Sequence, residues 1–561
     1  MPSSETALPP LTLTTHEVKN QPPPLVGYNL FTSDVALVEG LRREGGAFAE
    51  EEVTAFGALM GSEETIALGF AANKFTPVLH THDRFGRRRD EVEFHPAWHE
   101  LMRISMAHGI HNRPWRSPRP GAHVARAAMS VMASQIESGH GCPITMTFGV
   151  VPSIRMQPDL AAEWEPLLMG THYDPRFVPA SQKPAVTFGM AMTEKQGGSD
   201  VRANATRAVP LGQGGPGAEY AITGHKWFCS APQCDAFLVL AQAPKGLSCF
   251  LLPRFLPDGT RNRFFLQRLK DKLGNRSNAS SEIELDGAWA RMVGEEGRGV
   301  PTIIEMANHT RLDCVIGSTG LMRQAVAQAT HHAAHRAAFG RRLIEHALMK
   351  NVLADLSLEA EAATALMMRL ARAYDEENGG DVRGRPLRRI MTAVAKFWVT
   401  KRAVLMIPEA LECLGGNGYV EDSILPRLYR EAPVNSVWEG SGNVICLDVL
   451  RAMAKEPGAL EGLIGEVKQG AGADRRLDAY VKRIEDDLRK IDELEVSARR
   501  LVEKMALALQ ASLLVRHAPS AVADAFCASR LSEAQSLTFG ALPASVDFGA
   551  ILGRALPTSR I

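Results

Sequence analysis

The sequence has little that would mark a disulfide-stabilised, metal-binding or membrane-spanning protein. Its 561 residues include only eight cysteines, which are scattered without a CxxC pair or a nearby histidine at zinc-ligand spacing. No apolar run approaches the roughly 18 to 20 residues of a transmembrane helix. The first residues also lack a basic region followed by an apolar stretch, as a signal peptide would have. We therefore expect reduced thiols, no metal site and a cytoplasmic location.

Net charge is absent as well, because 63 Lys and Arg residues balance 63 Asp and Glu residues. No field over the whole chain would attract nucleic acid or a membrane surface. Hydrophobic residues make up 45% of the chain and charged residues 22%, which is typical of a folded globular protein. No internal repeat of about 20 to 50 residues is visible, which argues against solenoids and propellers.

The apolar pattern predicts a mainly α-helical protein with a central β domain. Helical periodicity over 33–137 is followed by short strand-like runs separated by Gly, Pro and Asn, and helical periodicity returns after Gly299. The predicted domains are an N-terminal helical domain with an irregular arm at 1–185, a β domain at 186–292, a helix bundle at 293–450 and an additional C-terminal helical domain at 451–561.

One helix of the predicted bundle has a clear apolar face. Apolar residues recur at alternating spacings of three and four, as on one side of an α-helix: Leu353, Leu356, Ala360, Ala363, Met367, Leu370 and Tyr374. A break at 377–385 separates this helix from another over about 387–414, which should stop at two glycines. We expect both helices to pack on their neighbours.

A literal GxGxxG stands at Gly212, Gly214 and Gly217. The dinucleotide-binding fingerprint requires a preceding buried strand and a following helix. Here Pro216 interrupts the motif and the residues after it alternate like a strand. We interpret the segment as a hairpin loop, which disfavours a Rossmann dehydrogenase.

Four polar clusters, three of which contain glycine, are more informative. They are MTEKQGGSD at 192–200, HKWFCS at 225–230, HRAAFG at 335–340, and GGNGY followed by WEGSGN within 415–443. Their order and spacing resemble the acyl-CoA dehydrogenase flavoproteins. The segments HEVKNQPPPL, GCPITMTFG and KDKLGNRSNAS, together with the long C-terminal extension, are similar to the AidB-type, alkylation-response branch of that family.

This resemblance implies a fold, a cofactor and a reaction. The fold would be a helical N-terminal domain, a β-barrel or sandwich middle domain and a helix bundle, with an extra helical domain at the C-terminus. The cofactor would be FAD and the substrate an acyl-CoA thioester, in a homotetramer. The chemistry would be α,β-dehydrogenation, in which a base removes an α proton while the flavin accepts a hydride.

The resemblance assigns the first flavin contacts to the clusters at 192–200 and 225–230. Backbone groups and hydroxyls would hold the flavin, and Trp227 would lie along its ring. The family usually has Thr or Ser where this chain has Cys229, which is a weak donor, and Ser230 could substitute. The candidate ligands are Met192, Thr193, Gly198, Ser199, Trp227, Phe228, Cys229 and Ser230.

A second group of residues would reach a flavin bound in a neighbouring subunit. By the resemblance, Arg336 and Phe339 contact its pyrophosphate and adenine, for which a guanidinium is suited. Gly415 and Gly416 would let the backbone approach the same pyrophosphate. Glu412 stands where the family often has Gln, and an acid there does not favour phosphate unless its charge is paired.

Glu439 matches the general base of most of the family. The surrounding motif adds the cofactor candidates Trp438, Gly440, Ser441 and Asn443. Some relatives carry the base on another helix, at a position that here is Thr310, which cannot serve. Arg311 beside it is either the counter-charge of the catalytic site or part of a buried ion pair of the bundle.

The C-terminal extension indicates a second function, as an alternative. In the AidB-type branch it is associated with binding double-stranded DNA under alkylation stress, yet 451–561 carries 16 Lys or Arg against 15 Asp or Glu. The alternative is thus a DNA-binding flavoprotein with residual dehydrogenase activity, or a merely salt-bridged helical surface. The candidate DNA contacts are Arg475, Arg476, Lys482, Arg483, Arg499 and Arg500.

Overall fold

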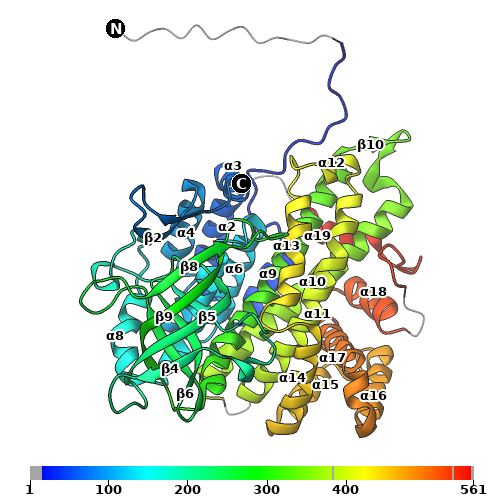
Figure 1. The fold of residues 1–561 in the computed structure, drawn as a ribbon. Helices are drawn as coiled ribbons and strands as arrows, with labels where there is room; N and C mark the ends of the chain where they lie inside the picture. The colour runs from blue at the N-terminus through cyan, green and yellow to red at the C-terminus, as the bar shows by residue number, and fades with distance from the viewer. Residues whose placement is uncertain (1–14, 382–383, 533–535, 558–561) are drawn as a thin grey trace, which may run out of the picture.

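The computed structural model describes residues 15–381, 384–532 and 536–557. Helices dominate, and one β domain lies beside the helix bundle (Figure 1). The mainly α architecture with a central β domain, predicted from the sequence, is confirmed. Among the described residues no helix is long and apolar enough to cross a membrane, and no cluster of His, Cys, Asp and Glu side chains could hold a metal ion.

The N-terminal part consists of short helices and one hairpin. Side-chain caps start two of the helices, since Asp34 accepts from the amide of Leu37 and Ser62 accepts from that of Thr65. The helices are α1 (Val35–Arg43), α2 (Glu50–Met60), α3 (Glu63–Lys74), α4 (Pro96–Ala107), α5 (Arg113–Arg116), α6 (Ala122–Ile136), α7 (Gly141–Ile154) and α8 (Pro158–Leu168).

The hairpin corrects the purely helical prediction for 33–137. Strands β1 (Val78–His82) and β2 (Arg88–Glu93) pair antiparallel. The turn between them is closed by Asp83, whose carboxylate accepts from the amides of Phe85 and Arg87. Local side-chain to backbone bonding of this kind favours a turn over a helix. Few apolar residues alternate in these strands, so the period-2 signal is weak.

The β domain is a barrel of seven strands. Pairings run β6–β4–β5–β9–β7 and return to β6, so these five strands close a ring, while β3 pairs with β6 and β8 with β9. Gly212, Gly214 and Gly217 lie between the antiparallel strands β4 and β5, which confirms the hairpin loop. The strands are β3 (Phe188–Ala191), β4 (Arg207–Pro210), β5 (Glu219–Ser230), β6 (Ala236–Ala243), β7 (Gly246–Pro253), β8 (Phe264–Leu269) and β9 (Ser280–Val293).

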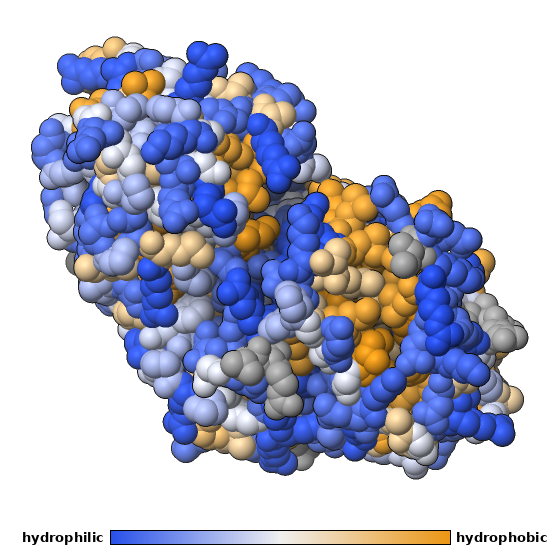
Figure 2. All heavy atoms as spheres, turned by 90° about the horizontal axis from the view of Figure 1, so that it is seen from below, coloured by the Kyte–Doolittle hydropathy of each residue, from blue (hydrophilic) through white to orange (hydrophobic). Residues whose placement is uncertain are grey.

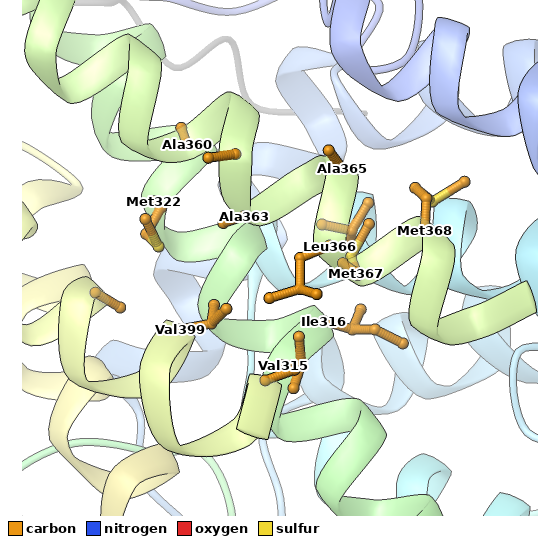
Figure 3. Close-up of a cluster of buried hydrophobic side chains, with 14 of the residues drawn as sticks. Val315, Ile316, Met322, Ala360, Ala363, Ala365, Leu366, Met367, Met368 and Val399 are labelled. Atoms are coloured by element: carbon orange, nitrogen blue, oxygen red, sulfur yellow. The ribbon is translucent and has the colours of Figure 1, made fainter. Parts of the chain in front are cut away.

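The bundle is built around three long helices, α9 (Gly299–His335), α10 (Ala347–Asn378) and α11 (Gly384–Glu412). Their apolar side chains interdigitate in the core, where Val315 and Met322 of α9 lie near Met367 of α10 and Val399 of α11 (Figure 3). The predicted apolar face of α10 is confirmed, since all seven of its residues are buried. The remaining elements before residue 456 are β10 (Ala337–Ala338), β11 (Arg341–Arg342), α12 (Gly416–Tyr419), α13 (Leu425–Val437) and α14 (Gly442–Lys455).

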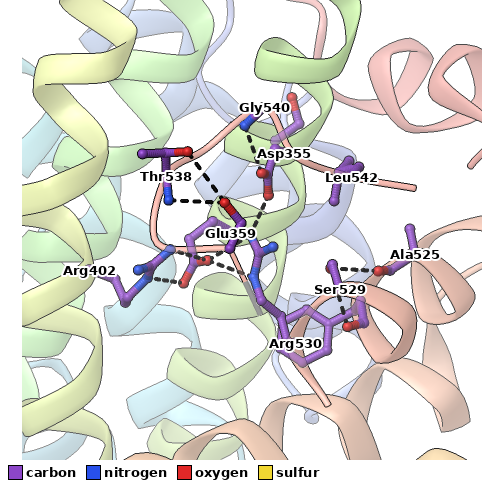
Figure 4. Close-up of polar contacts among 12 residues, drawn as sticks. Asp355, Glu359, Arg402, Ala525, Ser529, Arg530, Thr538, Gly540 and Leu542 are labelled. Atoms are coloured by element: carbon purple, nitrogen blue, oxygen red, sulfur yellow. Dashed lines mark hydrogen bonds and ion pairs between the residues drawn. The ribbon is translucent and has the colours of Figure 1, made fainter. Parts of the chain in front are cut away.

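Five further helices cover the bundle. They are α15 (Ala459–Lys468), α16 (Arg475–Leu488), α17 (Leu494–His517), α18 (Ser520–Arg530) and α19 (Phe548–Ala555). Buried charges hold them in place: Arg530 of α18 pairs with Asp355 and Glu359 of α10, and Arg402 of α11 binds Glu359 as well (Figure 4). The underside of the molecule is mostly hydrophilic, with one broad hydrophobic area on the side that carries α14 to α17 (Figure 2).

Candidate functional site

Glu439 lies in a tight turn between α13 and α14 with a positive φ of 58°. Three successive carbonyls of this turn accept hydrogen bonds from buried cations. Lys396 of α11 donates to the carbonyls of Trp438 at 2.9 Å and Gly440 at 2.5 Å. Arg311 of α9 donates through Nε to the carbonyl of Glu439 at 2.9 Å. A non-glycine residue rarely adopts this φ, so the two cations stabilise a strained backbone.

The Glu439 carboxyl group is set up as a weak acid. Burial raises its pKa above the ordinary value of a glutamate, while the charges of Arg311 and Lys396 and a hydrogen bond from Thr310 act against that rise. Its Oε2 is buried and has no hydrogen-bond partner among the described residues. A carboxylate with a raised pKa and a free oxygen is suited to take up a proton at a working pH near neutrality.

Arg311 takes part in a buried ion pair of the bundle. Its Nη1 donates to Asp448 of α14 at 2.9 Å, and this ion pair is more than nine-tenths buried. The same guanidinium binds the backbone carbonyl of Glu439. Its positive charge opposes the rise in the pKa of the Glu439 carboxyl group that burial causes. Arg311 therefore acts on Glu439 through the turn and through its charge, as a positioning residue.

The charge of Glu439 also acts on two buried thiols. Cys314 of α9 and Cys142 of α7 both have thiol pKa values raised to about 12 by burial, and the charge of Glu439 adds to each rise. Ser230 at the end of β5 hydrogen-bonds to the Cys142 thiol. Glu439 is therefore within electrostatic reach of residues of α7 and α9.

The segment 192–200 is fixed to the barrel by a buried ion pair. Glu194 and Lys226 are 2.8 Å apart, and neither side chain is exposed. The carbonyl of Thr193 accepts from the amide of Trp227 at 2.8 Å, which joins the two predicted flavin clusters. Gly198 packs closely against Thr193, because a Cβ at position 198 would lie 2.4 Å from the Thr193 hydroxyl. Met192 binds Asn204 through its carbonyl, and Ser199 is exposed.

A bulge in β5 turns the side chains of the cluster 225–230 in different directions. The register to β9 shifts between Lys226 and Cys229. Trp227 is half-buried and Phe228 is exposed, whereas the Cys229 side chain is fully buried in the barrel core. A cofactor could thus meet Cys229 only through its backbone, while Ser230 is partly exposed.

Lys270 covers the Trp227 ring. Its Nζ lies 3.2 Å from the ring centroid, and the same ammonium pairs with Glu282 at 2.6 Å. A cation over an aromatic face is an attractive arrangement. The lysine is absent from the sequence-based candidates because no spacing rule connects position 270 to position 227.

The second predicted group lies at the other end of the bundle. Arg336 follows the last residue of α9, 25 positions after Arg311, which is about 38 Å along a helix. Phe339 is 96% exposed with a φ of 51° at the tip of the β10–β11 hairpin. The segment near residue 20 connects the parts of this end of the bundle. The carbonyl of Asn20 accepts from Arg336, and Gln21 accepts from Asn417, which lies next to Gly415 and Gly416. Arg336 is therefore far along α9 from Arg311, which contacts the turn of Glu439.

The residues after Glu439 have mainly backbone roles. Trp438 donates from Nε1 to Asn435 at 2.9 Å, and Gly440 has a φ of 109°. Ser441 precedes the first turn of α14 and makes no side-chain cap bond there. Asn443 accepts a hydrogen bond from Arg499 at 2.9 Å, so one predicted DNA contact lies beside the predicted catalytic turn.

The other predicted DNA contacts divide into two kinds. Arg476 is neutralised by Asp474 and Asp524, and Arg483 donates to the carbonyl of Leu531. The rest of the set is exposed on α16 and α17: Arg475, Lys482, Arg499 and Arg500. These four are the exposed members of the predicted set, and exposure is what a contact with phosphate requires.

Family models match most of the chain. Residues 20–175 match the adaptive response protein AidB N-terminal domain, 189–288 the acyl-CoA dehydrogenase middle domain and 297–454 the acyl-CoA dehydrogenase C-terminal domain. AidB of Escherichia coli is 46% identical over 91% of this chain and 94% of its own length. The chain belongs to the AidB branch of the acyl-CoA dehydrogenase family. This confirms the resemblance noted in the sequence.

Two further comparisons come from Caenorhabditis elegans. Acyl-CoA dehydrogenase family member 11 is 32% identical over 78% of this chain and 73% of its own length. The crystal structure of ACDH-11 in complex with C11-CoA superposes with a TM-score of 0.84 at 27% identity, over 95% of this chain and 96% of that one. The AidB-type fold, including the helices after the bundle, is therefore shared. Acyl-CoA dehydrogenases bind FAD.

Sequence reasoning missed Lys396, Lys270 and the Glu194–Lys226 pair. Lys396 is 1% exposed, and burial lowers its pKa to about 8. A lysine in the middle of an apolar helix face is the signal that could have identified it, because a buried lysine nearly always has a partner. The Glu194–Lys226 pair had no comparable signal, since its two members belong to segments separated by a loop.

Proposed function

We propose that the protein is an FAD-dependent acyl-CoA dehydrogenase in which Glu439 is the general base. The observation that carries this proposal is the geometry of Glu439, whose backbone is fixed through three carbonyls and whose Oε2 is buried without a partner. Glu439 would remove the α proton of the acyl group. FAD, when bound, supplies the acceptor for the β hydride.

The chain offers groups that fit FAD. Gly415 and Gly416 have no heavy atom within 4 Å of the place where a Cβ would lie, so a pyrophosphate could approach the backbone there. The amide of Gly415 itself donates to the carbonyl of Glu412 at 2.9 Å. Trp227 presents a half-buried ring, and the segment 192–200 presents the Thr193 and Ser199 hydroxyls. We assign the flavin ring to Trp227 and the 192–200 segment, and the pyrophosphate and adenine to Arg336, Phe339 and the two glycines.

This assignment requires at least two copies of the chain. Trp227 and the 192–200 segment belong to the barrel, whereas Arg336 lies at the end of α9, far along that helix from Arg311. One FAD can contact both groups only if each group comes from a different copy. A homotetramer with four such sites is the assembly we propose, and the mass of the particle in solution tests it.

The test of the activity uses purified, FAD-loaded protein. Anaerobic mixing with saturated acyl-CoA thioesters, beginning with a medium-length chain such as C11-CoA, should reduce the flavin and bleach its absorbance. Glu439→Gln should retain FAD and lose bleaching, whereas Glu461→Gln, an exposed residue of α15, should behave like wild type. Full bleaching by Glu439→Gln would contradict the assignment of the base.

Binding of double-stranded DNA is a second candidate function. It is favoured by the four exposed cations on α16 and α17. Such contacts would go to phosphates and would be independent of base sequence. In this case the dehydrogenase activity would be residual, and DNA binding would persist in Glu439→Gln.

A further inference from the structure

A cavity of about 190 Å³ lies apart from the catalytic turn, between the N-terminal part and the barrel. Its wall is built from strand β2, helix α4, the segment around Tyr173 and the turn between β5 and β6. Neither Glu439, Trp227 nor any residue of α9 lines it. The nearest link to the proposed active site is Pro143, which follows Cys142 in α7. The cavity is therefore a separate space.

Polar groups in this cavity lack partners within the described residues. The amide of Gln233 has neither a donor for its Oε1 nor an acceptor for its Nε2, although both atoms are buried. The indole Nε1 of Trp98 is also unpartnered, in a side chain that is only 2% exposed. Buried polar groups of native proteins are nearly always satisfied by protein, water or ligand. One donor and one acceptor on the same amide, with a second donor nearby, form a recognisable pattern.

Most charged residues of the wall have a partner of opposite charge. Arg176 pairs with Asp174, and Lys183 pairs with Asp235 behind the wall. Arg254 donates to the carbonyls of Pro232 and Asp90. The carboxylates of Asp90 and Glu91 are held by arginines outside the cavity. The acidic groups of the wall are thus already paired, and the guanidinium of Arg254 is bound to carbonyls without a carboxylate partner among the ion pairs of the described residues.

Aromatic side chains give the cavity its shape. Phe94 and Trp98 stack with ring centroids 4.0 Å apart and planes inclined by 22°. Phe177 lines another side, under the guanidinium of Arg254. Such surfaces favour a flat, partly apolar molecule. An apolar cavity of about 150 Å³ can hold benzene, so this one has room for a six-membered ring with a small substituent.

We propose that this cavity is a binding site for a small, planar molecule that carries an amide. The amide of the ligand would pair with Gln233, its N–H with Oε1 and its carbonyl with Nε2. Trp98 would donate to the same carbonyl oxygen of the ligand, which can accept two hydrogen bonds. Exposed Pro175 and Arg176 stand at the rim and mark the side from which the ligand enters.

Benzamide is the probe that tests this proposal, and toluene is its apolar counterpart. Calorimetric titration of the holoprotein should show saturable binding of benzamide and weaker binding of toluene. Gln233→Leu should weaken benzamide binding by about tenfold, as expected for the loss of a buried hydrogen bond, and should leave toluene binding unchanged or tighter. Gln267→Leu, which alters an exposed glutamine of the barrel, should bind benzamide like wild type.

Trp98→Phe gives a second, milder variant, since it removes the N–H and keeps an aromatic ring. It too should lose affinity for benzamide and not for toluene. Absence of saturable benzamide binding to the wild-type protein would overturn the proposal and indicate a cavity filled by water. Equal binding of benzamide and toluene, unaffected by Gln233→Leu, would overturn it as well, because the cavity would then be an unselective apolar void. FAD absorbance, recorded in each titration, keeps these results separate from the proposed dehydrogenase activity.

Discussion

Lys396 binds the backbone on both sides of Glu439, because its ammonium group donates to the carbonyl of Trp438 and to that of Gly440. Arg311 donates to the carbonyl of Glu439 itself. The carboxylate therefore projects from a backbone that has little freedom to move. Preorganisation of this kind is valuable for a base, since proton abstraction depends on position as much as on pKa.

Replacing Lys396 should consequently impair turnover more than substrate binding. In Lys396→Met the ammonium is lost and two buried carbonyls are left without a donor, so the turn should shift. A displacement of about 1 Å at a catalytic group can cost about a hundredfold in rate, and we expect a fall of that order in kcat with FAD content retained. The measurement is steady-state kinetics with an artificial electron acceptor. Lys455→Met, on the exposed end of α14, is the control, and an unchanged kcat in Lys396→Met would contradict the positioning role.

The raised pKa of Glu439 predicts the pH dependence of both rate and stability. The rate of flavin reduction should rise with pH through a pKa above that of an ordinary glutamate, because only the carboxylate removes a proton. For stability, the folded-state pKa lies above the unfolded one. The contribution of Glu439 is thus most favourable below the unfolded pKa and is lost as pH rises through the folded pKa. Urea titrations should show Glu439→Gln gaining stability relative to wild type at pH 8 and not at pH 4.

The attachment of the C-terminal helices should depend on Arg530. Its guanidinium pairs with the buried carboxylates of Asp355 and Glu359 on α10. Removal of one partner from a buried pair typically costs about 3–5 kcal/mol, since the remaining charges stay buried. Arg530→Ala should lower the free energy of unfolding by about that amount in urea denaturation. Arg475→Ala, on an exposed site of α16, should change it by less than about 0.5 kcal/mol.

Much of the fold follows from local pattern, and the exceptions have physical reasons. The face of α10 from Leu353 to Tyr374 is periodic over six turns, so its burial could be predicted. The hairpin β1–β2 could not be predicted from the apolar pattern, because its largely polar strands carry no alternation of apolar and polar residues. The break at 489–493 between α16 and α17 was also invisible, since apolar residues continue at heptad-like spacing across it.

The candidate site divides in the same way. The turn of Glu439 could be predicted from a contiguous motif, and Thr193 and Trp227 from motifs that adjacent backbone segments bring together. Lys396 contacts Glu439 from a position 43 residues earlier, through helix packing that the sequence does not encode locally. The core position of Cys229 depends on a bulge in β5, which shifts the alternation of side chains by one residue.

The salt dependence of DNA binding will measure how many cations take part. Each neutralised phosphate contributes about −0.9 to the slope of log K against log salt. The four exposed cations of α16 and α17 therefore allow a slope of at most about −3.6 per chain. Charge reversal of Lys482 and Arg500 together should reduce the slope by about 1.8, measured by fluorescence anisotropy with duplexes of two unrelated sequences. Absence of duplex binding at low salt would remove the second candidate function.

A FAD site shared between two copies can be tested by complementation. Arg336→Ala and Trp227→Ala damage different ends of the chain, so each variant alone should lose FAD. When the two variants are co-expressed, a mixed pair contains one site with Trp227 from one copy and Arg336 from the other, both intact. Its second site carries both substitutions. Tagged, purified mixed assemblies should therefore regain FAD at up to half of the sites. If each site were formed within a single chain, every site of the mixture would carry one substitution and no FAD would return. Recovery of about half the wild-type flavin content, expected when one of two sites is rebuilt, would establish that Arg336 serves the cofactor of a neighbouring copy.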